Sequence, residues 1–421
     1  MPSSLWKNGV GGIVGNVMEW YDFAVFGYLT PILSHHFFPE EDKLTALIMT
    51  YGIFATGYLM RPLGGVLFGF VGDRYGRKKA LLLSIFMMAL PTVLIALLPT
   101  YAQIGWVAAL LLILLRMIQG LSVGGELIGS VSFMVEIAPA NRKGLFGSLT
   151  LGSAVGGLLL GSATVMTMQI FLGEACMRAW GWRLPFLGGL VILATGLWLR
   201  RQMGESPEFL KLEQTAKIDK TPLKEALRNG WRSMLRLTGI VALATVTSYI
   251  MFVWVPTFLS QIVDHPLHDT LRINTAAMVI LLLTIPLAGH LSDRFGHRRT
   301  MIAATLATIV AIWPIFRLLQ TGSWESALMA QALFAVIAGF LQGPLPALMA
   351  GMFPVAVRYT SIGIGYNLSV ALIGGTAPAV ATWLVEISGD TDAPVYYILF
   401  FALVTLLALW RVNPSPPVPR R

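Results

Sequence analysis

Charged side chains are scarce in this chain of 421 residues. Only 12% of the residues are Asp, Glu, Lys or Arg, whereas 56% are hydrophobic. A soluble domain usually carries about a quarter of charged residues. So small a charged fraction could not cover a water-facing surface, so the composition argues against an ordinary soluble protein and predicts a membrane protein.

Metal-ligating and nucleotide-binding patterns are also lacking. The single cysteine, Cys176, excludes an intramolecular disulfide and a thiolate metal cluster, and the six histidines are scattered. There is no Walker loop, and the segment Gly363-Ile364-Gly365 follows no predicted strand, so it does not indicate a dinucleotide site. We therefore expect neither an enzyme, nor a cofactor, nor a metal, nor ATP as the energy source.

The net charge of +9 does not indicate nucleic-acid binding, because the basic residues cluster in short loops between apolar stretches. A membrane span needs about 20 mostly apolar residues. Twelve stretches meet this length, and the first contains Glu19 and Asp22, so we expect a transmembrane helix there and not a cleavable signal. The stretches are 9–35, 45–71, 80–98, 104–135, 145–171, 184–200, 233–262, 272–291, 300–319, 326–350, 358–386 and 394–411.

The charged loops alternate in sign, which orients the predicted bundle. The loops with Arg74, Arg77, Lys78, Lys79, Arg142, Lys143, Arg294, Arg298 and Arg299 are basic. The opposite loops hold Glu40, Glu41, Asp42, Asp264, Asp269, Asp390 and Asp392. The basic side is expected to be cytoplasmic, and an even number of helices then places both termini there.

One long polar segment divides the chain, and a repeated motif relates the two parts. We expect a six-helix bundle over 1–200, a partly helical cytoplasmic linker over 201–232, a second bundle over 233–412 and a cytoplasmic tail over 413–421. The segment from Gly69 to Lys78 recurs from Gly289 to Arg298, with aspartates at 73 and 293. Internal duplication of this kind is typical of transporters that bind substrate near the midplane, between their repeats.

The duplicated G-x-x-x-D-R-x-G motif resembles the loop signature of the major facilitator superfamily. Other segments resemble its metabolite:proton symporter family, and within it the bacterial proline/glycine-betaine symporters, with citrate and 2-oxoglutarate carriers next. These segments are 15–23, 61–65, 119–126, 180–186, 205–209, 353–359 and 374–378. The resemblance implies an all-α fold of two pseudo-symmetric six-helix bundles in the bacterial inner membrane.

Ionisable residues inside predicted spans point to the coupling mechanism, because each is costly in a bilayer unless it is paired or hydrated. Glu19 and Asp22 are three residues apart and share a helix face, roughly 15–20 Å from the cytoplasmic end. Arg116 lies at similar depth and is expected to pair with Glu19 or Asp22. This group is either a proton carrier or a static ion pair. Glu126 is expected to relay protons or to pair with Arg142 or another loop cation.

Substrate-binding candidates are the aromatic and polar residues of the predicted spans. An aromatic residue facing the cavity could stack on a cationic solute. The candidates are Trp20, Tyr21, Gln119, Tyr249, Trp254, Gln331, Gln342, Arg358, Tyr366 and Asn367. The alternative for most of the aromatic residues is packing within the bundle.

The repeated loops supply gating candidates, namely Asp73, Arg74, Arg77, Asp293, Arg294 and Arg298. An aspartate there can cap a neighbouring helix N-terminus and pair with an arginine. The alternative is a role in topology alone. His297 replaces the expected arginine of the second copy, so a weaker contact is expected there.

These observations predict a proton-coupled symporter whose partners are protons, a small polar solute and the lipid bilayer. Two mid-membrane acids and one base, Glu19, Asp22 and Arg116, favour a zwitterion such as proline or betaine. An organic acid is the alternative, although the further arginines Arg61, Arg183 and Arg358 appear near helix ends. A channel or a non-transporting receptor is less consistent with the duplicated loop. The sequence does not indicate the oligomeric state.

Overall fold

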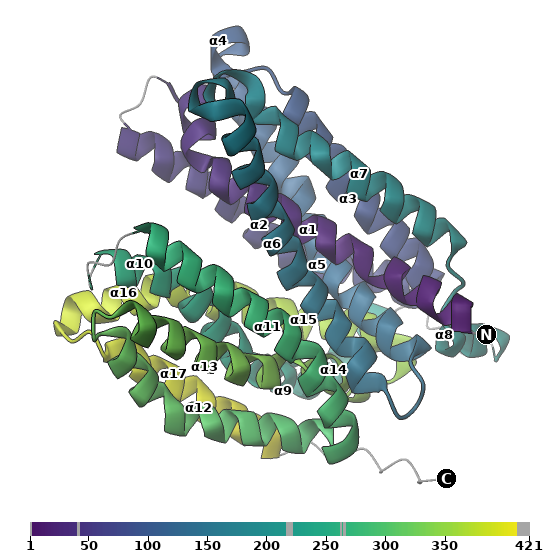
Figure 1. The fold of residues 1–421 in the computed structure, drawn as a ribbon. Helices are drawn as coiled ribbons and strands as arrows, with labels where there is room; N and C mark the ends of the chain where they lie inside the picture. Colours follow the sequence, from purple (N-terminus) through teal and green to yellow (C-terminus); the bar gives the residue numbers. More distant parts are fainter. Residues whose placement is uncertain (1, 40–42, 216–221, 262, 264–266, 411–421) are drawn as a thin grey trace. The chain divides into compact units, whose positions relative to one another are not determined.

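The computed structural model describes residues 2–39, 43–215, 222–261, 263 and 267–410, and every regular element among them is a helix (Figure 1). The acidic residues Glu40, Glu41, Asp42 and Asp264 and the predicted tail from 413 lie outside the described residues.

Among the described residues, the first half contains eight α-helices. They are α1 (Pro2–Phe37), α2 (Lys43–Tyr75), α3 (Arg77–Leu97), α4 (Tyr101–Ile104), α5 (Val107–Ile137), α6 (Lys143–Cys176), α7 (Arg183–Gln202) and α8 (Pro207–Gln214). The described part of the second half contains nine. They are α9 (Pro222–Tyr249), α10 (Val255–Gln261), α11 (Leu267–Phe295), α12 (His297–Leu319), α13 (Trp324–Gln342), α14 (Leu345–Gly351), α15 (Arg358–Ser369), α16 (Ala377–Ser388) and α17 (Ala393–Trp410).

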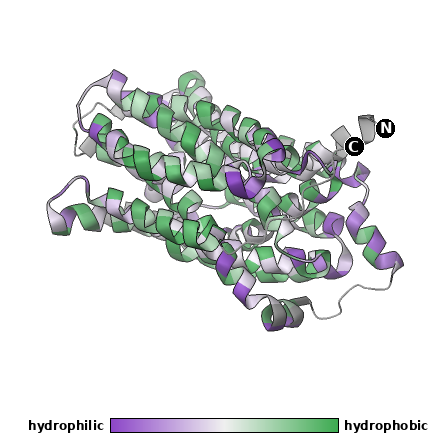
Figure 2. Cartoon of the chain, turned by 90° about the horizontal axis from the view of Figure 1, so that it is seen from below, coloured by the Kyte–Doolittle hydropathy of each residue, from purple (hydrophilic) through white to green (hydrophobic). Residues whose placement is uncertain are grey.

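These helices account for the twelve predicted spans. Ten helical stretches among the described residues are long and apolar enough to cross a bilayer. The helices α1 and α2, of 36 and 33 residues, complete the set. Figure 2 shows that hydrophobic residues predominate along the long helices. The linker is partly helical, as expected, because α8 forms within it and is capped by the Ser206 side chain.

Several predicted spans are interrupted. The π-helical turn Ile250–Trp254 joins α9 to α10, and the π-helical turn Val370–Gly374 lies between α15 and α16. A third, Met177–Gly181, follows α6. The tenth predicted span breaks at Gly343 and Pro344 into α13 and α14, where proline lacks the N–H that a continuous helix needs.

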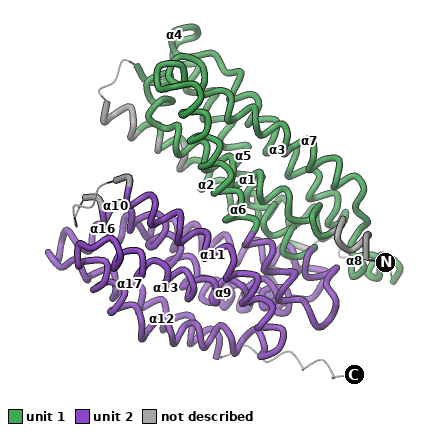
Figure 3. The backbone as a smooth tube through the Cα atoms, viewed as in Figure 1, with its two compact units in different colours: residues 1–133, 153–223 green, residues 134–152, 224–421 purple. Residues whose placement is uncertain are grey.

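The chain forms two compact units (Figure 3). Unit 1 comprises residues 1–133 and 153–223, and unit 2 comprises residues 134–152 and 224–421. The end of α5 and the start of α6 therefore belong to unit 2. The predicted bundle limits at 200 and 233 stay a prediction.

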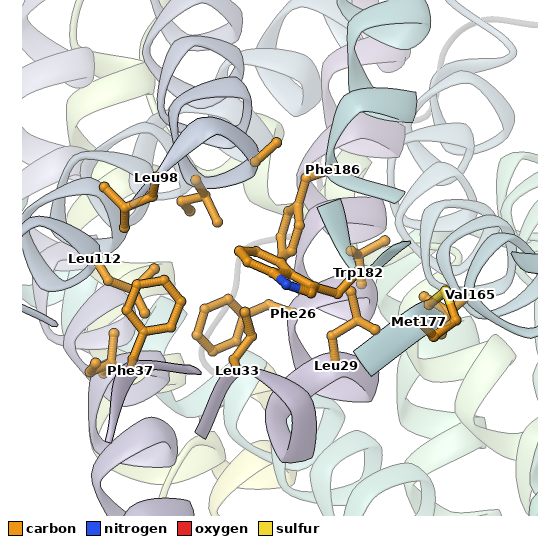
Figure 4. Close-up of a cluster of buried hydrophobic side chains, with 14 of the residues drawn as sticks. Phe26, Leu29, Leu33, Phe37, Leu98, Leu112, Val165, Met177, Trp182 and Phe186 are labelled. Atoms are coloured by element: carbon orange, nitrogen blue, oxygen red, sulfur yellow. The ribbon is translucent and has the colours of Figure 1, made fainter. Parts of the chain in front are cut away.

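An apolar cluster forms the core of unit 1 (Figure 4). Phe26, Leu33 and Phe37 of α1 pack with Trp182 and with Phe186 of α7. The rings of Trp182 and Phe186 meet edge to face, with centroids 6.4 Å apart. This packing holds α1 against α7. It therefore helps to position Glu19 and Asp22, which lie on the N-terminal side of Phe26 in the same helix.

In unit 2, α11, α12 and α13 pack side by side. The two copies of the repeated motif have the same backbone form. Gly76 separates α2 from α3 with φ 104°, and Gly296 separates α11 from α12 with φ 94°. A residue with a Cβ rarely adopts such angles, so both copies need glycine at this turn.

Candidate functional site

The acids of α1 lie inside unit 1, beside α3 and α5. Asp22 is fully buried, and its Oδ2 lies 2.6 Å from Arg116 Nη1 of α5. The predicted pairing of Arg116 with Glu19 or Asp22 is thereby confirmed, with Asp22 as the partner. The Arg116 guanidinium also lies over the Phe26 ring, 3.9 Å from its centroid.

Two neutral side chains close a ring of hydrogen bonds around this ion pair. Thr92 Oγ1 of α3 donates to Asp22 Oδ1 at 2.9 Å, and Gln119 Nε2 donates to Thr92 Oγ1 at 2.8 Å. Arg116 Nη1 in turn donates to Gln119 Oε1 at 2.7 Å. Gln119 and Arg116 are three residues apart on α5, which places them on one face. Thr92 was not among the predicted site residues.

Glu126 belongs to a second buried ion pair. Its carboxylate accepts from both terminal nitrogens of Arg200 on α7, with one contact at 3.1 Å, and from the Ser84 hydroxyl. Arg200 also donates to the Gly11 carbonyl at 3.1 Å. Glu126 thus forms an ion pair, but its partner is Arg200 and not the suggested loop residue Arg142, and its role as a proton relay stays a prediction. Arg200 lies at the end of α7 and was read as part of the helix boundary, so the sequence did not indicate this partner.

Gly15 of α1 makes room for the second pair. A Cβ at this position would collide with Glu126 Oε1 and with Arg200 Nη2. A larger residue here would force the buried Glu126 and Arg200 side chains to shift out of their ion-pair geometry.

Glu19 differs from both other acids. It is 1% exposed, and neither carboxylate oxygen has a hydrogen-bond partner among the described residues. The charges that act on it are Arg61 and Glu126, of opposite sign. Glu19 thus lies one helical turn from Asp22 but outside its hydrogen-bonded ring.

Arg61 lies deeper than the sequence suggested. It is on α2, fourteen positions before the final residue Tyr75, and it is 1% exposed. The expectation that Arg61 lies near a helix end is therefore wrong.

Among the described residues, no group of three or more His, Cys, Asp and Glu side chains could hold a metal ion.

The aromatic candidates of α1 lie in the packing of unit 1. Tyr21 is 2% exposed, belongs to the core cluster, and donates its hydroxyl to the Pro185 carbonyl at 2.6 Å. Trp20 is half-buried and its ring lies 5.9 Å from that of Phe23. These contacts support the packing alternative for Tyr21.

The candidates of unit 2 form polar contacts around the π-helical turn Ile250–Trp254. Trp254 Nε1 donates to Thr382 Oγ1 at 2.9 Å. The Trp254 ring stacks on the Phe258 ring, with their centroids 4.9 Å apart. Gln342 Nε2 donates to Ser248 Oγ at 3.0 Å. The Oε1 atom of Gln331 is buried and has no hydrogen-bond partner among the described residues.

The remaining substrate candidates lie on or beside α15. Arg358 Nη1 lies 2.9 Å from Glu136 Oε1, and both side chains are nearly buried. Asn367 donates to the Gly363 carbonyl of its own helix at 2.9 Å. Tyr366 is 8% exposed, and Tyr249 lies close to Gly374. The structure thus brings Arg358 into an ion pair.

The two repeated loops make different contacts. In the first, Asp73 Oδ1 lies 3.1 Å from Arg77 Nη1, both buried. In the second, Asp293 accepts from the backbone N–H groups of Gly144 and Leu145 at 2.6 and 2.9 Å, which caps the start of α6. His297 Nδ1 lies 2.9 Å from Ser292 Oγ. His297 thus makes its hydrogen bond with Ser292, while Asp293 accepts from the start of α6.

The basic gating candidates also diverge. Arg74 is exposed over the rings of Phe70 and Tyr75. Arg298 donates to the carbonyls of Leu409 and Trp410 at 2.8 and 3.1 Å, and Arg294 is exposed.

Glu205, just after α7, caps the start of α3. Its carboxylate accepts from the backbone N–H groups of Arg77 at 3.0 Å and Lys78 at 3.1 Å. Burial raises the pKa of the Glu205 carboxyl above its usual value, although these bonds and the Arg77 charge act in the opposite direction.

Known proteins resemble the chain along nearly its whole length. Residues 10–236 match the family "Sugar (and other) transporter", and residues 270–421 match "Major Facilitator Superfamily". A proline/betaine transporter of Salmonella typhimurium is 36% identical over 94% of this chain and 80% of that protein. An alpha-ketoglutarate permease of Escherichia coli is 37% identical over 94% of this chain and 91% of that protein.

Solved structures agree on the fold. A structure of the proton:xylose symporter XylE has a TM-score of 0.79 at 18% identity and covers 97% of this chain and 95% of that chain. The predicted major facilitator fold is thereby confirmed. The chain belongs to the sugar (and other) transporter family of the major facilitator superfamily, and it is a multi-pass membrane transporter and not an enzyme.

Proposed function

We propose that the chain is a proton-coupled symporter that imports a small zwitterionic solute of the proline or betaine type by alternating access. The proton gradient supplies the energy. The membrane is the bacterial inner membrane, with both termini in the cytoplasm, as the basic loops indicate.

The state of Glu19 carries the proposal. Asp22 has a directly bonded arginine, Arg116, and Glu126 has Arg200. Glu19 is equally buried and has no hydrogen-bond donor among the described residues. A buried charge without donors is costly, so such a carboxyl gains most from binding a proton. Glu19 is thus the acid of unit 1 best suited to load and release the coupled proton.

The Asp22–Arg116 pair is suited to sense that proton. Glu19 and Asp22 share α1, so a change in the charge of Glu19 acts on a nearby ion pair. The effect is strong because the protein interior around the pair has a low dielectric constant. Proton loading would then alter how firmly Arg116 is held.

The names of relatives support the zwitterionic substrate. A second relative, from Dickeya dadantii, is described as a glycine betaine/proline/ectoine/pipecolic acid transporter and is 35% identical over 94% of this chain. These substrates combine one positive and one negative charge, which matches a site that holds both buried acids and buried arginines.

The alternative is a proton symporter of an organic acid such as 2-oxoglutarate or citrate. The depth of Arg61 favours it, because Arg61 lies within α2 and could attract an anion. The identity to the alpha-ketoglutarate permease, at 37%, also favours it.

Uptake into proteoliposomes distinguishes the two. Purified protein is tested with labelled proline, glycine betaine, 2-oxoglutarate, citrate and shikimate, with and without an inward proton gradient. Saturable, gradient-dependent accumulation of proline or betaine is expected. Accumulation of 2-oxoglutarate or citrate alone would establish the alternative, and uptake that ignores the gradient would overturn proton coupling.

A further inference from the structure

A groove runs along unit 2 where the end of α11 and the start of α12 meet α13. Its volume is about 670 Å³, within the range of ~300–1,000 Å³ that is usual for small-molecule sites. All of its lining residues belong to these three helices. None of them is a candidate for proton coupling or substrate binding.

One end of the groove is cationic. Arg294 and Arg299 line it, and both are exposed. Neither guanidinium has an ion pair or a hydrogen bond within the described part of the chain. The nearby Asp293 carboxylate is directed to the start of α6, and none of the described residues that line the groove is acidic. The two arginines are therefore available to an anion.

The rest of the groove is apolar and follows the helix axis. Arg299, Ala303 and Ala307 are spaced four residues apart on α12, so they form a stripe about 12 Å long. Ala303 and Ala307 are exposed and small, and Val336 and Phe340 of α13 form the facing wall. The small residues leave a trough that begins at the arginines and continues along the span.

We propose that this groove binds one anionic phospholipid, with its phosphate between Arg294 and Arg299 and an acyl chain along Ala303 and Ala307. The spans of α11, α12 and α13 place the trough at the depth of the bilayer, and the arginines lie at its edge. Basic sites at such a position attract anionic headgroups. A soluble phosphate would use the arginines but not the apolar trough.

Native mass spectrometry of delipidated protein tests the site, with phosphatidylglycerol and phosphatidylcholine of the same chain length as probes. The parent is expected to bind one phosphatidylglycerol more tightly than the further, weakly held lipids. Arg299→Gln should weaken that binding about fivefold, the effect of one basic residue near a membrane surface. Ala307→Phe, which fills the trough, should weaken the binding of both lipids at this site.

Two control variants separate the groove from general effects. Lys79→Gln removes the same charge from the corresponding position of the first motif copy, and Leu306→Phe enlarges an exposed residue that does not line the groove. Both should bind phosphatidylglycerol like the parent. Equal binding by Arg299→Gln, Ala307→Phe and the parent would overturn the proposal.

Competition distinguishes the lipid from a free anion. Inorganic phosphate and glycerol 3-phosphate should displace phosphatidylglycerol only at concentrations far above that of the lipid, because they lack the acyl chain. Displacement at equal concentration would assign the site to a soluble anion and overturn the lipid proposal.

Discussion

Arg116 of α5 and Asp22 of α1 form a buried ion pair, with Nη1 and Oδ2 2.6 Å apart. Thr92 donates a hydrogen bond to Asp22, and Arg116 donates one to Gln119, so each member of the pair has a further contact that orients it. Low-dielectric surroundings make such a pair sensitive to any change of charge nearby. Glu19, one turn away on the same helix, is the group that we propose to bind the coupled proton.

Glu19→Gln should abolish accumulation driven by the proton gradient while retaining exchange of solute across the membrane. The amide mimics the protonated acid and removes the group that loads the proton. Uptake and counterflow in proteoliposomes measure the two activities. Glu174→Gln, at an exposed carboxylate paired with Arg178, is the matched control and should behave like the parent. Gradient-driven accumulation by Glu19→Gln would show that another group carries the proton.

Arg116→Gln should lower the free energy of unfolding by about 3–5 kcal/mol, because it leaves the buried Asp22 carboxylate without its cation. The double variant with Asp22→Asn should recover part of this loss, since it removes both charges. Thermal unfolding in detergent measures the stability of the parent, both single variants and the double variant. Additive losses in this cycle would mean that the two side chains do not interact.

Gly15→Ala should destabilise unit 1 by about 1–3 kcal/mol, because the added methyl group overpacks the Glu126–Arg200 pair. Gly27→Ala on the same helix is the control, since nothing lies within 4 Å of the Cβ that it adds. That substitution should stabilise α1 slightly, as alanine favours a helix. If both variants unfold at the same temperature, the close approach at Gly15 is not a constraint.

Arg358→Gln should cost about 3–5 kcal/mol of stability, because it removes the positive charge that lies beside the buried Glu136 carboxylate. Adding Glu136→Gln should restore much of that stability and separates two roles for Arg358. Transport by the double variant would assign Arg358 to the ion pair. A restored fold with no substrate binding would support the predicted contact with substrate.

Glu205→Gln should change how stability depends on pH. Because the pKa of Glu205 is raised in the folded protein, the folded state holds this proton more tightly than the unfolded state does. The contribution of the group is therefore full below its ordinary pKa of 4.5 and declines as pH rises through the raised value. The unfolding temperature of the parent should fall relative to that of Glu205→Gln between pH 4 and pH 7. A constant difference would contradict the shift.

The sequence predicted the spans well, because about twenty apolar residues in succession have no alternative to crossing or being buried. The motif copies at Asp73 and Asp293 also revealed the duplication. The contacts of these two aspartates could not be predicted from the sequence. Asp73 pairs with Arg77 of its own loop, whereas Asp293 caps α6, which is far away in the sequence. Nothing in the repeated letters distinguishes these two outcomes.

The candidate site was predicted in part. Glu19, Asp22, Arg116 and Glu126 were visible because charge inside a span is costly and therefore conspicuous. Thr92, Ser84 and Arg200 were missed. Threonine and serine are common in spans, and an arginine near a helix end usually reflects topology. Tyr21 was taken for a possible ligand although its hydroxyl bonds to Pro185 in the core.

The sequence by itself determined the helices, their duplication and the charges that the membrane must accommodate, because these follow from local composition and spacing. The tertiary structure alone decided which charges are matched. Helix packing brings residues as far apart as Asp22 and Arg116, or Glu126 and Arg200, to contact distance. Among the described residues it leaves both carboxylate oxygens of Glu19 without a hydrogen-bond donor, which depends on the helices that pack around α1 and not on local sequence.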